Sequence, residues 1–243
     1  AEQWIRKGIA AIEKHWPGIA SQLRASFIEM RKGEQDWTRV AALHADDFFV
    51  EPSLQTFQTL QQAAKRAGVW PDVRAAAMRY LETGARPQPS TPSWPLPESG
   101  LKTTTEPRLI HPPMTDQLID IAIAEKRPDE VLRWYDQRKP RPRGLDYGWF
   151  AEDRIAEAVM EAYPDRAVAI WKQLAEKQIA LTKPKAYEEA AGYLRKVHRV
   201  QKQLGKEQDW ENYLASIRRT NERKRRLVQI LDTLSGRRIV DVM

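Results

Sequence analysis

Residues 185–217 read KAYEEAAGYLRKVHRVQKQLGKEQDWENYLASI, and this stretch decides the fold class. Its first part carries apolar side chains at helical spacing: Tyr187, Ala190, Ala191, Leu194, Val197 and Leu204. Gly205 interrupts the pattern, and a second apolar stripe begins at Trp210. Because apolar residues three or four positions apart share one helix face, the stretch predicts two amphipathic helices joined by a tight turn.

Helical periodicity of this kind runs through most of the 243 residues, beginning with an expected helix from about Trp4 to Trp16. No convincing run of six residues alternates between apolar and polar as a strand would. Three expected helices open on Pro–Asp, at Pro71, Pro128 and Pro164. Proline suits the first helical turn, and aspartate complements the helix dipole there. The sequence predicts an all-α fold of stacked helical hairpins, forming an α-solenoid.

The helical pattern stops in the segment 86–113. Its first part, RPQPSTPSWPLPESG (86–100), contains five prolines, which remove backbone donors and favour extended chain. We expect an N-terminal helical subdomain at 1–85, a Pro-rich connector at 86–113 and a C-terminal helical-repeat subdomain at 114–243. One continuous solenoid is the alternative. Trp94 is expected to strap the connector against a helical domain.

The tetrapeptide EQDW occurs twice, at 34–37 and at 207–210, each time shortly after a glycine. We interpret both copies as helix–turn–helix joints, with acidic residues in the first turn of the next helix and a tryptophan at its first core position. After the second copy we expect one long helix, from about 208 to 234, with a polar middle.

Residues that carry catalysis are not evident. The chain has no cysteine, which excludes disulfides, a thiol nucleophile and cysteine-ligated zinc within it. No two of the four histidines have the spacing of a helical metal pair. A glycine-rich phosphate loop and a GxSxG motif are absent. The sequence therefore predicts a protein that is not an enzyme and that uses no cofactor and no metal.

The apolar runs are too short for a membrane span, and the first residues lack the apolar core of a secretory signal. We therefore expect a cytoplasmic protein with no membrane partner. The first residue is Ala rather than Met, so we expect the chain to be a piece of a longer protein.

Positive charge is concentrated near the C-terminus. Of the net charge of +7, residues 185–226 contribute +6, from 12 Lys and Arg against 6 Asp and Glu. The candidate binding residues are Arg195, Lys196, Arg199, Lys202, Arg218, Arg219, Arg223, Lys224, Arg225 and Arg226. Three interpretations are open: a solvated helical surface, a site for nucleic acid or another polyanion, and a site for an acidic protein partner. Few aromatic residues interleave with these cations, which disfavours single-strand binding.

Four segments resemble a known family: WPDVRAAAMRYLETGARP (70–87), WPLPESGL (94–101), LIDIAIAEKRPDEVLRWYD (118–136) and AYEEAAGYLRKVHRV (186–200). They are similar to the helical C-terminal region of bacterial SWIM zinc-finger proteins. The pairing of helices is also loosely similar to the right-handed superhelix of tetratricopeptide-like repeats. The SWIM motif requires three cysteines and a histidine, so no zinc ligand is carried over to this chain.

The SWIM resemblance implies a helical scaffold attached to a zinc module, which we expect upstream of residue 1. It also implies an association with DNA or protein that the missing module could supply alone. Our leading hypothesis from the sequence is a non-enzymatic protein-interaction scaffold. The alternative is nucleic-acid binding through the basic face of residues 195–226.

Overall fold

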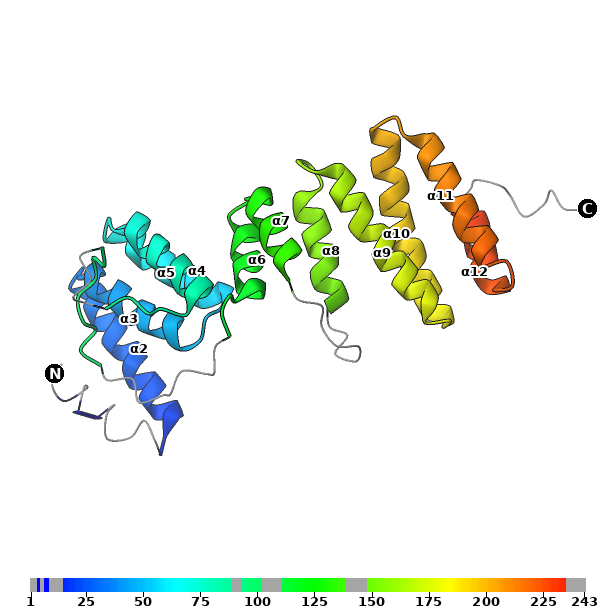
Figure 1. The fold of residues 1–243 in the computed structure, drawn as a ribbon. Coiled ribbons are helices and arrows are strands. Elements are labelled where there is room, and N and C mark those ends of the chain that lie inside the picture. Colours follow the sequence, from blue (N-terminus) through cyan, green and yellow to red (C-terminus); the bar gives the residue numbers. More distant parts are fainter. Residues whose placement is uncertain are drawn as a thin grey trace, which may run out of the picture. The chain divides into compact units, whose positions relative to one another are not determined.

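The computed structural model describes residues 4, 7–8, 15–88, 93–101, 111–138 and 148–234. In these ranges the chain forms eleven helices, α2 to α12, and no strand, which confirms the predicted all-α class (Figure 1). The helix expected from Trp4 to Trp16 lies mostly outside the described residues. The chain divides into two compact units, residues 1–124 and 125–243.

Five helices of the first unit lie within the ranges just given: α2 (Pro17–Gly33), α3 (Trp37–Val50), α4 (Leu54–Arg66), α5 (Trp70–Thr83) and α6 (Thr115–Ala124). Helix α3 packs between α2 and α4, and α4 in turn contacts α5 and α6. Aromatic rings fill the centre, with Phe48 contacting Phe49, Phe57 and Tyr80 edge-on or tilted. The Tyr80 hydroxyl donates a buried hydrogen bond of 2.7 Å to the carbonyl of Phe49 and so ties α5 to α3.

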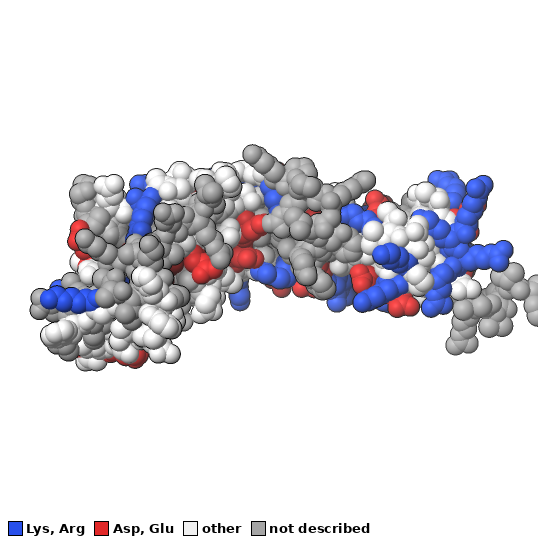
Figure 2. Space-filling view, turned by 90° about the horizontal axis from the view of Figure 1, so that it is seen from below, with Lys and Arg blue, Asp and Glu red and all other residues white. Residues whose placement is uncertain are grey.

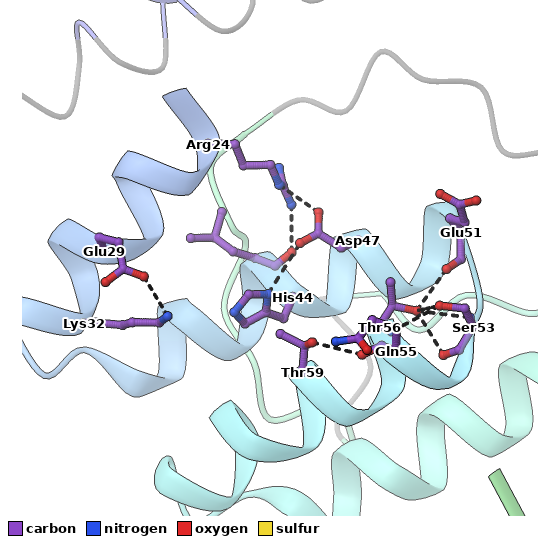
Figure 3. A network of polar contacts seen from close by, with 11 residues as sticks. Arg24, Glu29, Lys32, His44, Asp47, Glu51, Ser53, Gln55, Thr56 and Thr59 are labelled. Atoms are coloured by element: carbon purple, nitrogen blue, oxygen red, sulfur yellow. Dashed lines mark hydrogen bonds and ion pairs between the residues drawn. The ribbon is translucent and has the colours of Figure 1, made fainter. Parts of the chain in front are cut away.

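Polar side chains join the first two helices of this unit (Figure 3). Arg24 of α2 donates to the carbonyl of Leu43 at 2.7 Å, and its Nε lies 2.8 Å from Asp47 of α3. His44 lies 3.5 Å from the other oxygen of the same carboxylate. Ser53 caps α4 in a reciprocal capping box with Thr56. The contacts of Arg24 tie α2 to α3, and the capping box satisfies backbone groups at the start of α4.

Residues 86–88 and 94–101 of the Pro-rich connector lie along α3, whereas Pro112 lies close to Gly84 at the end of α5. Trp94 is half-buried, with its ring 5.8 Å from that of Phe49, and Leu96 and Leu101 are buried beside it. The connector is thus strapped to a helical domain as expected, by two leucines as well as the tryptophan. Residues 89–92 and 102–110 of the predicted connector lie outside the described residues.

The described part of the second unit forms six helices: α7 (Pro128–Gln137), α8 (Gly148–Val159), α9 (Pro164–Ala180), α10 (Pro184–Gln203), α11 (Glu207–Thr220) and α12 (Arg225–Leu234). From α7 to α11 each helix packs on the next in the chain (Figure 1). Helix α12 folds back onto α10 as well as α11. The three Pro–Asp dipeptides lie in the first turns of α5, α7 and α9, as predicted.

Three turns close helical hairpins in the same way. After α2, α4 and α10 the chain adopts positive φ at Gln35 (56°), Gly68 (75°) and Gly205 (68°). In each turn two backbone N–H groups reach back to carbonyls of the last helical turn, as when Lys206 donates to Gln201 at 2.8 Å. This pattern is the Schellman motif, which satisfies carbonyls that the helix end leaves free.

Gly205→Ala tests this turn. The left-handed conformation costs an L-residue roughly 1–2 kcal/mol, while open space around Gly205 means that a methyl group meets no atom. We therefore expect the free energy of unfolding to fall by about 1 kcal/mol in urea titrations followed by circular dichroism. Gly33→Ala is the control, because Gly33 also has open space but no positive φ. An equal loss in the control would contradict the conformational explanation.

Two expectations were wrong. The predicted helix from 208 to 234 is two helices, because residues 221–224 form a turn. Asn221 ends α11 by donating its side-chain amide to the carbonyl of Ile217 at 2.9 Å. The two EQDW copies also differ in register. In the first copy neither Glu34 nor Asp36 lies in the first turn of α3, because Asp36 is the N-cap and accepts from Arg39 N–H. The second copy forms the first turn of α11, as expected.

Candidate polyanion-binding surface

Helix α10 is the centre of the candidate surface. One face of this helix is buried against its neighbours, and it carries Ala186, Tyr187, Ala190, Ala191, Leu194, Val197, Val200 and Gln201. At about 100° per residue, these positions cover about half of the helical circumference. The opposite face therefore points outward along the whole length of the helix.

The outward face of α10 forms a basic stripe, which we define as Lys185, Arg195, Arg199 and Lys202. All four side chains are exposed. Glu188 and Gly192 lie on the same face, since 185, 188, 192, 195, 199 and 202 follow the three-and-four spacing of one helical side. The structure therefore adds Lys185 to the predicted site. The sequence alone could have predicted it, because Lys185 precedes Gly192 by seven residues and Arg195 by ten, and both spacings place residues on the same side of a helix.

Lys196 does not belong to the basic stripe. Its ammonium lies 2.6 Å from Asp153 and 2.7 Å from Glu157, both on α8. Burial alone would lower the pKa of Lys196, but hydrogen bonds to the two carboxylates outweigh it and the pKa is raised. Asp153 also accepts from the indole N–H of the buried Trp171 at 2.8 Å. Lys196 thus acts as a structural link between α10 and α8.

Three predicted cations near the turn between α11 and α12 are also engaged. Arg218 forms an ion pair with Asp232 at 2.6 Å, which fastens α12 to α11. Lys224 donates to the carbonyl of Ile179 at 3.3 Å, at the C-terminal end of α9. The guanidinium of Arg226 lies 3.6 Å from Glu188, which is exposed on the outward face of α10, as is the neighbouring Glu189.

The remaining six predicted cations are exposed, and none makes an ion pair or side-chain hydrogen bond with another described residue. They are Arg195, Arg199, Lys202, Arg219, Arg223 and Arg225. Figure 2 shows Lys and Arg side chains gathered on the right of the view, where Figure 1 places α10, α11 and α12.

The free cations form two groups. The contact between Arg226 and Glu188 places the α11–α12 turn beside the first turns of α10. Arg223 and Arg225 therefore lie near the exposed Lys185, together with Lys183 at the N-cap of α10. The second group, Arg195, Arg199 and Lys202, lies on the C-terminal half of α10, and Lys202 is 14 residues beyond Glu188, about 21 Å along the helix. The basic stripe therefore runs from one group to the other.

Two shallow hollows lie outside this surface. One, of about 390 Å³ between α9 and α11, has mixed charge: Asp165, Lys172, Lys206 and Asp209 line it. An ion pair of 2.7 Å between Lys206 and Asp165 crosses it. The other, of about 520 Å³, lies between α3 and the Pro-rich connector, in the first unit. Neither brings together groups with an evident catalytic arrangement.

Within the described ranges, no three His, Asp or Glu side chains are grouped so as to hold a metal ion. The helices that the structure describes include none with the length and apolarity of a membrane span. Fold and surface together define an all-helical protein with an exposed basic face. Comparison with known proteins finds no matching family model, no similar curated protein and no similar solved structure.

Proposed function

We propose that this chain is a non-enzymatic interaction scaffold whose second unit docks an acidic macromolecule. The observation that carries the proposal is the set of exposed cations on α10 and around the α11–α12 turn that no described carboxylate neutralises. Exposed like charges repel one another and weaken the folded state, and an acidic partner would relieve that repulsion.

The packing of successive helices supports an extended scaffold. In the second unit, contacts run mainly between neighbours in the chain, which is typical of repeat proteins. We propose a tetratricopeptide-like right-handed superhelix for this unit and membership of the SWIM zinc-finger family for the parent protein. A CxC…CxH pattern upstream of residue 1 would support the family assignment, and its absence from the complete parent sequence would exclude it.

Binding to a labelled polyglutamate peptide, measured by fluorescence anisotropy, tests the docking proposal. We expect saturable binding that weakens as salt rises from about 50 to 200 mM, because screening removes electrostatic attraction. The triple variant Arg195→Glu, Arg199→Glu, Lys202→Glu should bind far more weakly.

The matched control reverses three exposed cations elsewhere: Lys65→Glu, Arg79→Glu and Lys126→Glu. It changes the net charge equally and should keep most of the affinity. Absence of binding at low salt would refute the proposed function, and equal losses in the two triple variants would refute its placement on α10.

A further inference from the structure

The basic stripe of α10 fits one kind of acidic partner better than others. We propose that it binds the phosphodiester backbone of a nucleic-acid duplex, with Gly192 at the point of closest approach. This inference rests on the proposed docking function and specifies its partner.

The first argument is the lack of an apolar centre. Protein interfaces derive most of their affinity from buried aromatic and aliphatic anchors, while charges at their rim contribute little. The large apolar side chains that the structure shows exposed are Trp4, Trp16, Ile19, Tyr163, Leu181 and Leu204, and none lies on the stripe. A phosphate backbone needs no such anchor, because counterion release supplies most of its affinity.

The second argument is Gly192. A glycine inside a helix costs roughly 0.5–1 kcal/mol relative to alanine, so it usually has a local reason. Neither a tight contact nor positive φ explains this one: a Cβ there would meet nothing within 4 Å. Its place is midway along the basic stripe, between Lys185 and Arg195. A missing side chain at that position lets a ligand backbone approach the helix while cations contact it on both sides.

The third argument is length. Lys185 and Lys202 are 17 residues apart, about 26 Å along the helix axis. A duplex carries one phosphate per strand for about every 3.4 Å, so the stripe spans roughly seven phosphates. Arg223 and Arg225 add exposed positive charge in the α11–α12 turn, which the contact of Arg226 with Glu188 joins to the first turns of α10. The stripe therefore has the dimensions to follow one backbone.

The stripe carries no exposed aromatic side chain on which an unpaired base could stack. Sequence is read by contacts to base edges, whereas phosphate contacts position a protein without reading sequence. We therefore expect binding to duplexes with little dependence on their sequence, and weaker binding to single strands.

Anisotropy titration of the full chain with labelled DNA duplexes of two unrelated sequences tests the stripe. Reversal of Arg195, Arg199 and Lys202 to Glu should make the slope of log affinity against log salt shallower by about 3. The triple Lys65→Glu, Arg79→Glu, Lys126→Glu should leave that slope nearly unchanged. Equal slopes in the two variants would overturn the proposal. An RNA duplex, run in parallel, shows which nucleic acid the stripe prefers.

Gly192→Gln tests close approach without a change of charge. We expect affinity for the duplex to fall on the order of tenfold, as fewer cations reach phosphates, while the melting temperature is kept or raised. Gly18→Gln is the matched control, since Gly18 is also helical with open space around its Cβ position. Wild-type affinity in Gly192→Gln would refute the role of Gly192.

Comparison of the polyglutamate and duplex probes distinguishes the proposed docking function from the inference that the partner is a duplex. Binding of the duplex with these losses supports the inference. Binding of polyglutamate but not of duplex overturns the inference and leaves the docking function standing. Tighter binding of single strands than of duplexes overturns the choice of duplex. Binding of neither probe overturns both.

Discussion

Trp171→Ala is expected to destabilise the second unit by about 3–5 kcal/mol, the usual cost of deleting a large ring from a packed core. The indole of Trp171 is fully buried in α9, and its N–H donates to Asp153 of α8 at 2.8 Å. The substitution leaves a cavity and removes one of the two groups that hold this carboxylate. Urea unfolding followed by circular dichroism at a helical wavelength measures the loss.

Trp171→Phe separates packing from hydrogen bonding. Phenylalanine fills much of the space but cannot donate to Asp153, so we expect a loss of about 1–3 kcal/mol. Lys196 still neutralises the carboxylate in this variant. A loss from Trp171→Ala that is no larger than that from Trp171→Phe would show that the ring volume contributes little.

Trp210→Ala is expected to cost roughly 3–5 kcal/mol as well, because the ring is only 4% exposed. The ring stacks on His198 of α10, with centroids 4.9 Å apart and planes 18° from parallel. This contact holds α11 against α10 directly after the turn at Gly205. Urea unfolding measures the cost, and polyglutamate binding by the folded variant should be nearly unchanged because Trp210 is outside the basic stripe.

Trp37→Ala is the matched comparison, because Trp37 ends the other EQDW copy. Its ring is half-buried, with the guanidinium of Arg66 over it at 4.3 Å. We expect a distinctly smaller loss, since the cost of truncation follows the apolar area buried. Equal losses at Trp37 and Trp210 would contradict the different registers in which the two copies are used.

The helices themselves could be predicted because their signals are local. Periodic apolar residues, proline in the first turn and glycine after the last turn each depend on neighbours within about four residues. They can therefore be recognised in the sequence without knowledge of the fold. The break at residues 221–224 was missed because polar residues at those positions suit either a solvated helix or a turn. Packing of α12 on α10 favours the turn, and that contact is not local.

The EQDW repeat shows the same limit. All four residues lie in α11 in the second copy, but in the first copy only Trp37 lies in α3. There Gln35 takes the left-handed conformation that Gly205 supplies in the second unit. The sequence correctly predicted two helix joints. It could not predict the register, because the position of the positive-φ residue depends on which side chains each hairpin must bury.

The set of cations that are free to bind a partner was the feature that the sequence predicted least well. Ten cations were predicted as one basic face, but the structure gives Lys196, Arg218, Lys224 and Arg226 partners on other helices or on carbonyls. It brings Lys183 and Lys185 into the candidate surface from outside the predicted set.

By itself, the sequence determined the all-helical class, most helix boundaries and the concentration of positive charge, because propensity, capping and composition act locally or are simple sums. Only the tertiary structure decided which cations stay free, since an ion pair joins residues far apart in the chain as readily as neighbours. Lys196 and Asp153 are 43 positions apart in the chain and 2.6 Å apart in space. The candidate surface consists of the exposed cations that such pairings leave without a partner among the described residues.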